Sequence, residues 1–145
     1  MQSSGNDGPA SGNRERGGWP THLVEYLGMT YDEEASGDGR VVASLEIQPE
    51  HLAPNGFLQA TVVVGLADLT CAHGTFETIP QGASFTTVEL KTNLLSSALE
   101  GRIVCEATLK HGGRTTQVWD AEVRSEATGR TMALFRCTQL VLQPR

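Results

Sequence analysis

The stretch His51–Gly74, HLAPNGFLQATVVVGLADLTCAHG, decides how the rest of the chain is interpreted. A polar opening with a proline and a glycine leads into a long apolar run that contains a single carboxylate, Asp68. The run from Phe57 to about Phe76 has no proline and is longer than an ordinary strand, which favours one helix. Thr61 and the valines that follow it favour β structure, so two buried strands are the alternative.

Apolar residues occur nearly all round this expected helix, so we expect it to be buried on most sides. One stripe differs, because Thr61, Gly65, Asp68 and Ala72 are spaced so that they share a single face. An ionised side chain within an apolar run is costly unless it has a partner or a task. Asp68 is therefore either a structural carboxylate, bonded to Thr70 or Thr61 or paired across a dimer, or a functional group.

The chain before this stretch divides into a tail and the start of a domain. Residues 1–18 are rich in Gly, Ser, Asn and charge, so we expect a disordered tail and a single domain over residues 19–145. The sequence WPTHLVEYLGM at 19–29 predicts a short helix that lies across a sheet or covers a pocket. A turn at 36–39 and the alternation over 41–48 predict a β-hairpin.

The chain after this stretch is read as β structure throughout. Long β segments are expected at 83–96, 101–111 and 114–142, and the turn EATG at 126–129 divides the last of them. Short turns between successive strands favour an antiparallel meander. One long buried helix against a curved antiparallel sheet is an α+β fold.

The composition excludes several functional classes. The net charge of -6 in 145 residues and the pI near 5.1 argue against a nucleic-acid-binding protein. Counted along the chain, residues 1–89 carry three Lys/Arg and twelve Asp/Glu, whereas residues 90–145 carry eight and five. The absence of a secretory signal and of an apolar run of membrane length predicts a soluble cytoplasmic protein without a membrane partner.

The cysteines and histidines do not show the spacing of a metal site, so no metal is expected. The cysteines are predicted to be reduced core residues. We interpret His51 as a loop residue, and His73 as a helix-end residue that interacts favourably with the helix dipole. Trp19 and Trp119 are interpreted as packing residues, with a ligand channel as the alternative for Trp119.

Three passages, in this order, resemble the hotdog-fold acyl-CoA thioesterases of the phenylacetate-degradation (PaaI-like) family. They are NGFLQATVVVGLAD at 55–68, TVELKTNLLSSALEG at 87–101 and RTTQVWDAEVRSEATGRTMALFRC at 114–137. The resemblance covers about Leu23 to Leu142. It implies a hotdog fold, in which a curved sheet wraps a central helix, and an enzyme that hydrolyses a small or medium acyl-CoA, with an aromatic acyl group favoured by analogy.

The resemblance also implies site residues. Asp68 matches the family's catalytic carboxylate, which would act as a general base on water or as a nucleophile. Gly56 matches the family glycine ahead of the helix, and Asn55 lies beside it. Asn93 lies on a strand that the family uses to line its substrate pocket.

The helix start departs from the family pattern, because Gln59, Ala60 and Thr61 occupy the places of the family's H-G-G segment. The N–H of Ala60, or of Gln59, is the candidate donor to the oxyanion, and Thr61 is a candidate substrate contact. Ala60 and Asp68 are eight residues apart, roughly 12 Å along a helix. If both act on one thioester, they must come from two subunits of a two-fold dimer.

The phosphates of coenzyme A require cations, for which Lys91, Arg114 and Arg130 are the candidates. Coenzyme A is part of the substrate, so no separate cofactor is expected. The family implies a homodimer, or a pair of dimers. Two rivals use the same fold: a non-catalytic acyl-CoA or acyl-carrier binding protein, suggested by the replaced H-G-G, and a hydratase, disfavoured by the absence of a His-containing motif near the helix.

Overall fold

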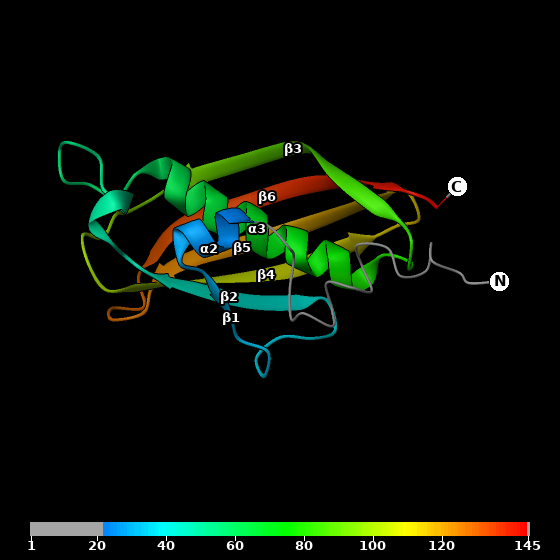
Figure 1. Cartoon of the computed structure of the whole chain (residues 1–145), viewed down its shortest axis with the longest axis horizontal. Helices are drawn as coiled ribbons and strands as arrows, with labels where there is room; N and C mark the ends of the chain where they lie inside the picture. Colours follow the sequence, from blue (N-terminus) through cyan, green and yellow to red (C-terminus); the bar gives the residue numbers. More distant parts are fainter. Residues whose placement is uncertain (1–21, 145) are drawn as a thin grey trace.

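The structure is a computed structural model that describes residues 22–144. The expectations for the tail at 1–18 and for Trp19 lie outside the described residues. Along the chain (Figure 1), the elements are α2 (His22–Leu27), β1 (Thr30–Tyr31), β2 (Arg40–Glu46), a short 3-10 helix (Pro49–His51), α3 (Ala60–Thr78), β3 (Ser84–Leu94), β4 (Arg102–Gly112), β5 (Thr116–Ser125) and β6 (Thr131–Leu142). The predicted helix and β segments are all present, with boundaries shifted by a few residues.

The strands form one six-stranded antiparallel sheet in the order β1-β2-β4-β5-β6-β3. The predicted meander is correct for β4, β5 and β6 but wrong for β3, which lies at the far edge beside β6. The connection from β3 to β4 therefore passes two strands. From Leu94 to Arg102 a chain can extend up to ~26 Å, whereas three strand spacings need only about 14 Å.

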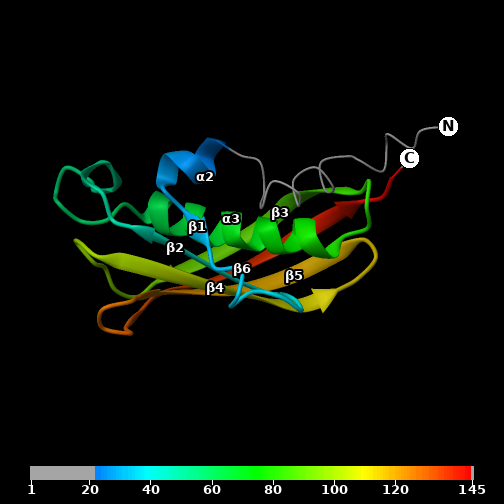
Figure 2. The ribbon, with the colours of Figure 1, turned by 60° about the horizontal axis from the view of Figure 1, so that its bottom comes forward.

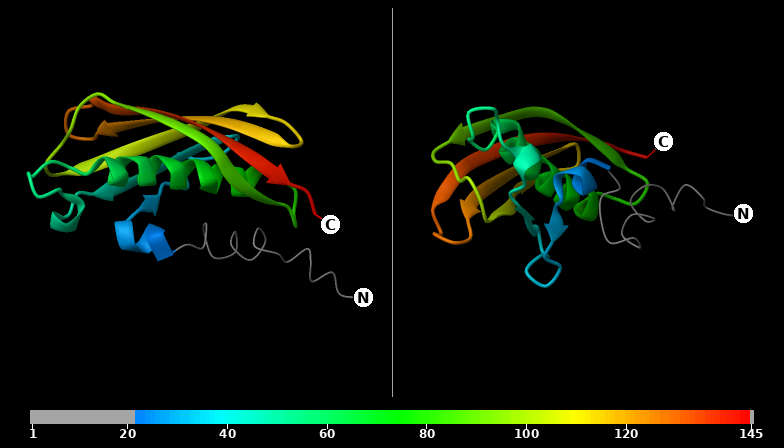
Figure 3. Two further views of the ribbon diagram at one scale, coloured as in Figure 1. Left: turned by 90° about the horizontal axis from the view of Figure 1, so that it is seen from above. Right: turned by 60° about the vertical axis from the view of Figure 1, so that its left-hand side comes forward.

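Helix α3 lies along the concave face of the curved sheet (Figures 2 and 3). Its apolar residues are buried on most sides, as predicted; among them Leu66 and Cys71 are 0% exposed. Cys105 on β4 and Cys137 on β6 are also fully buried, and all three cysteines are free thiols. The α+β hotdog architecture expected from the sequence is confirmed.

Helix α2 lies on α3, on the side away from the sheet (Figure 2). Of the two expected roles, lying across the sheet is therefore wrong, and covering a pocket stays a prediction. Leu27 packs beside Gly65, since a Cβ at Gly65 would lie 3.4 Å from Leu27 Cδ1. Gly28, at φ +73°, ends the short helix. No helix within residues 22–144 is both long and apolar enough to cross a membrane.

Candidate active site

Asp68 lies at the middle of α3 and faces the edge strand β3. Its Oδ1 is 3.4 Å from Thr87 Oγ1, and the side chain is half-buried. Burial raises the pKa of the Asp68 carboxyl, and the Thr87 hydroxyl lowers it when it donates to the ionised form. A carboxyl with a raised pKa at the rim of a core is suited to accept a proton.

The partner of Asp68 is not a threonine of its own helix. The Thr70 hydroxyl donates to the Leu66 carbonyl oxygen at 2.6 Å, and Thr61 is exposed at the helix start. The expected local pairing with Thr70 or Thr61 is therefore wrong. Asp68 interacts instead with a residue on a neighbouring strand.

The start of α3 presents free backbone donors. Gln59 caps the helix with extended backbone (φ -68°, ψ 134°), and its own N–H already donates to the His51 carbonyl at 3.0 Å. Its side-chain amide is directed at the carbonyls of Glu50 and Leu52, at 3.4 and 3.5 Å. Ala60, the first helical residue, is exposed, and its N–H precedes the intrahelical bonding pattern. Of the two candidate N–H groups, that of Ala60 is therefore the one without a backbone acceptor given by the helix geometry.

Asn55 and Gly56 form the turn that leads into this helix start. The Asn55 side-chain oxygen accepts the Phe57 N–H at 3.1 Å, and Gly56 has φ +87°, which favours glycine. Both residues are exposed. Their structural task is to shape the turn, and they lie beside the donors of α3.

The register of β3 against β6 separates the two faces of the edge strand. Residues directly opposite each other point to the same side of a sheet. Leu90 is opposite Cys137 and Leu94 is opposite Ala133, and both partners are buried beneath α3. Leu90 and Leu94 therefore face the helix side, yet they are 44% and 51% exposed because β3 is an edge.

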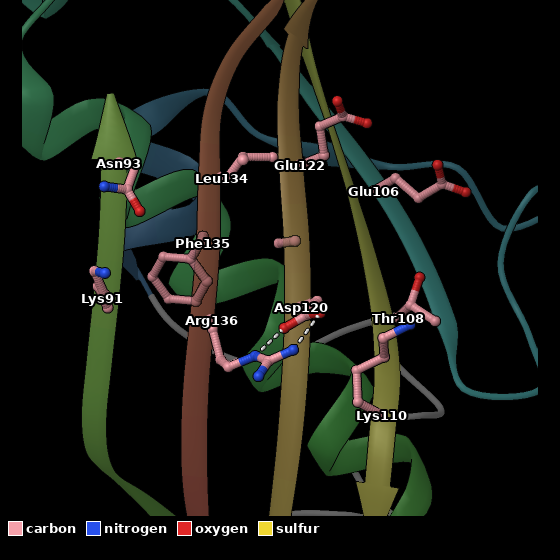
Figure 4. A pocket seen from close by; sticks show the side chains of 11 residues that line it. Lys91, Asn93, Glu106, Thr108, Lys110, Asp120, Glu122, Leu134, Phe135 and Arg136 are labelled. Carbon is pink, nitrogen blue, oxygen red and sulfur yellow. Dashed lines mark hydrogen bonds and ion pairs between the residues drawn. The ribbon is translucent and has the colours of Figure 1, made fainter. Parts of the chain in front are cut away.

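Lys91 and Asn93 point to the opposite, outer face, where they are paired in register with Arg136 and Leu134. Figure 4 shows them there with the bidentate Arg136–Asp120 ion pair, which holds the pKa of Asp120 below its usual range. A hollow of about 460 Å³ lies on this face. The structure thus does not bring Lys91 or Asn93 to Asp68 within one chain.

The other two predicted cations lie far apart. Arg114 is in the β4–β5 turn and Arg130 in the β5–β6 turn, at opposite ends of β5, about 30 Å from each other by strand rise. Only the β5–β6 turn lies at the end of the molecule where α3 begins (Figure 1). A single coenzyme A on one chain cannot use the three predicted cations together.

His73 and His51 both make structural contacts within the core. His73 is within α3 rather than at its end, is 5% exposed, and stacks on Tyr31 with ring centroids 4.1 Å apart. Burial lowers the pKa of His73, so the expectation of a cation stabilising the helix dipole is wrong. His51 is buried and accepts the Gln48 N–H at 2.9 Å through Nδ1. Residues 22–144 contain no cluster of three His, Cys, Asp or Glu side chains that could hold a metal.

The packing assignment of Trp119 is confirmed, because the residue is 0% exposed and donates through Nε1 to Gln117 Oε1 at 2.9 Å. Sequence reasoning missed Thr87 and Leu90. Alternation separates Leu90 from Lys91 and Asn93, and the register shift between Thr87 and Glu89 places Thr87 on the same face as Leu90. It also missed Gln139, a fully buried amide behind Thr87, for which a glutamine among apolar strand residues was the available signal.

Comparisons with a family model and with known proteins point to the same family. A family model of the thioesterase superfamily matches residues 55–132. A 1,4-dihydroxy-2-naphthoyl-CoA hydrolase of Listeria monocytogenes is 30% identical over 107 residues, which span 74% of this chain and 86% of that protein.

The similar solved structures agree with the observed architecture. A variant of a thioesterase from Staphylococcus aureus superposes with a TM-score of 0.80 at 27% identity, covering 85% of this chain and all (100%) of that one. A variant of the phenylacetic acid degradation protein PaaI from Thermus thermophilus has a TM-score of 0.74 at 23% identity, over 83% of this chain and 98% of that one. The second likeness concerns the fold alone.

Proposed function

Because this chain belongs to the thioesterase superfamily and is a thioester hydrolase, we propose that it hydrolyses a small or medium acyl-CoA to the free acid and coenzyme A. An aromatic acyl group is favoured by the name of the Listeria relative, which acts on a naphthoyl-CoA. The observation that supports this proposal is the half-buried Asp68 on the central helix, open towards an edge strand with exposed apolar side chains.

In the proposed reaction, Asp68 in its ionised form removes a proton from water, and the water oxygen attacks the thioester carbonyl carbon. The C–S bond then breaks, and the thiolate of coenzyme A leaves and takes up the proton that Asp68 removed, which returns Asp68 to its ionised form. The alternative is direct attack by the Asp68 carboxylate, which forms an anhydride that water opens. Both routes require a donor to the developing oxyanion.

The donor we propose is the Ala60 N–H of a second subunit. Ala60 and Asp68 are separated by eight residues of unbroken helix, about 12 Å, which is too far for one carbonyl to contact both groups in one chain. A two-fold axis passing beside Val64, halfway between them, sets Asp68 of one chain against Ala60 of the other. Each dimer then has two equivalent sites.

The edge strand β3 supports such a dimer. It spans eleven residues, Ser84–Leu94, and within the described sheet it pairs only with β6, so its outer backbone groups are available to another strand. Val88, Leu90 and Leu94 are 57%, 44% and 51% exposed. Pairing of two β3 strands would cover these side chains, continue the sheet and bring the two α3 helices side by side.

Hydrolysis of an acyl-CoA panel, with detection of free thiol, tests the proposal. We expect Asp68→Asn to lower kcat/KM by about 10²–10⁴-fold on the best substrate. Asp120→Asn is the matched control, because Asp120 lies on the outer face in an ion pair with Arg136, and it should retain wild-type activity. An unchanged rate in Asp68→Asn would remove Asp68 from the mechanism, and no hydrolysis of any acyl-CoA would favour a binding protein.

A further inference from the structure

Behind Asp68 a chain of polar side chains continues into the core. Thr87 Oγ1 lies 3.4 Å from Asp68 Oδ1 and only 2.8 Å from Gln139 Oε1. Thr87 and Gln139 are direct partners across β3 and β6, and Gln139 is 0% exposed. A buried amide two contacts away from a candidate base calls for a physical explanation, because burying it without a strong bond is costly.

A threonine hydroxyl has one proton and therefore donates one hydrogen bond. Asp68 and the Gln139 carbonyl therefore compete for this one proton, and the shorter contact favours the Gln139 carbonyl. While the proton is directed there, the Thr87 oxygen can only accept. Asp68 can donate to it only in its protonated form. When Asp68 ionises, the hydroxyl must turn towards it, and the buried Gln139 carbonyl loses its donor, at a cost.

We propose that Thr87 and Gln139 are positioning residues for Asp68: the buried amide orients the threonine hydroxyl, and the hydroxyl fixes one carboxyl oxygen and couples its orientation to proton uptake. This inference rests on the proposed function for the catalytic role of Asp68, but the coupling itself is a property of the folded chain. The Gln139 Nε2 is held in turn by Cys137 Sγ at 3.6 Å.

The other titratable groups near Asp68 do not take over the effect of Thr87 and Gln139 on its protonation. On the neighbouring strands, Glu89 and Arg136 are paired in register with outer-face residues, and Asp120 bonds Arg136 on that same face. Glu25 on α2 is exposed. Titratable groups on the inner side include the thiols Cys71, Cys105 and Cys137 and the stacked rings of Tyr31 and His73. Burial raises the pKa values of the Cys71 and Cys105 thiols, so both stay uncharged at neutral pH.

Two substitutions should move the protonation of Asp68 in opposite directions. Gln139→Met removes the carbonyl and frees the Thr87 hydroxyl to donate to ionised Asp68, so the acid limb of the kcat/KM–pH profile should move about one unit lower. Thr87→Val removes the only side-chain hydrogen-bond donor to the carboxylate within residues 22–144, so the limb should move higher. Thr87→Ser keeps the hydroxyl and should restore the wild-type profile.

The matched control is Gln117→Met on β5. Gln117 is also a buried amide, 4% exposed, but it bonds Trp119 and Thr78 instead of Thr87. This variant should leave the acid limb in place even where it lowers stability. A merely structural role for Gln139 predicts the same result for both glutamine variants.

Titration of the Asp68 side-chain carboxyl by ¹³C NMR measures the effect of Thr87 and Gln139 on the Asp68 pKa independently of enzyme activity. Opposite shifts in Gln139→Met and Thr87→Val, with none in Gln117→Met, would support the inference even if Asp68→Asn remained active and the catalytic proposal failed. Identical Asp68 titration curves in the wild type, Gln139→Met and Thr87→Val would overturn it, whatever the enzyme's activity.

Discussion

At the scale of the residue, the free-energy cost of burying the ionised Asp68 carboxylate is the feature that best indicates a functional role. The carboxyl interrupts the apolar surface of α3, and burial raises its pKa. A group whose folded pKa lies above its unfolded pKa stabilises the fold below the unfolded value, and this contribution is lost as pH rises through the folded value. At neutral pH, the ionised Asp68 therefore lowers the free energy of unfolding, and a catalytic role would explain why a carboxylate is present there.

We expect Asp68→Asn, which cannot ionise, to have a higher melting temperature than the wild type by a few degrees at pH 7. The difference should shrink as the pH falls through the raised folded pKa, and it should vanish below the ordinary aspartate value of 3.8, where the wild-type carboxyl is protonated in both states. Thermal unfolding followed by circular dichroism across this pH range measures it. Equal stabilities at pH 7 would mean that ionised Asp68 carries no net burial cost.

The same carboxyl should set the acid limb of the reaction. Since the ionised form is the active one in either route, kcat/KM should rise with pH through the Asp68 pKa, and the midpoint should lie above 3.8. Initial rates in buffers of constant ionic strength test this expectation. A limb at or below the ordinary aspartate value would contradict the burial of Asp68 as its cause.

At the scale of the element, α3 contains two glycines whose surroundings differ. A Cβ at Gly74 would lie 2.7 Å from Trp119 Cζ3 and closer still to Cη2, whereas at Gly65 the nearest atom is Leu27 Cδ1 at 3.4 Å. Gly74 is thus required by close packing of the helix on the sheet. Gly65 needs only a small adjustment of a flexible side chain.

Gly74→Ala should therefore destabilise the protein by about 1–3 kcal/mol through overpacking against Trp119. Gly65→Ala, the matched change on the same helix, should be neutral or stabilise by up to about 1 kcal/mol through helix propensity. Urea unfolding of both variants provides the comparison. Equal effects of the two changes would show that the close approach of Trp119 does not constrain position 74.

The edge strand β3 is the element that the proposed dimer depends on. Leu90→Asp places a charge on its helix-side face and should convert the dimer to monomers in sedimentation velocity, with loss of activity. Leu134→Asp is the control, because Leu134 is similarly exposed (48%) but lies on the outer face; it should leave the dimer intact. A Leu90→Asp variant that stays dimeric and active would exclude this interface.

At the scale of the whole molecule, the sequence predicted most of the elements and less of their arrangement. The long helix followed from its length, and the alternation of Ile103, Cys105 and Ala107 located a buried strand correctly. The position of β3 could not be derived, because a short connection limits distance without selecting the neighbouring strand. Placing β3 in a meander hid the contact between Thr87 and Asp68.

The candidate site was predictable to the same extent. Asp68 was proposed because it is the single carboxylate in an apolar run and matches the family's carboxylate, and its position on α3 follows from local helix geometry. Lys91 was assigned as a cation at a strand end, and Asn93 was assigned by the strand on which it lies. The register with β6 places both on the face opposite the helix. Which face a strand residue occupies depends on its pairing partner, which lies more than forty residues away in sequence.

The central claim is that each active site combines Asp68 of one chain with the helix start of another, and subunit complementation tests it most directly.

Ala60→Pro removes the candidate N–H while proline is accepted at the first position of a helix, and the extended Gln59 backbone suits a residue before proline. Asp68→Asn and Ala60→Pro are each expected to be nearly inactive alone. Mixed and allowed to exchange subunits at equal amounts, they should recover about a quarter of wild-type activity, since half of the dimers would be mixed and each would hold one intact site. Mixed dimers that form but recover no activity would contradict a shared site.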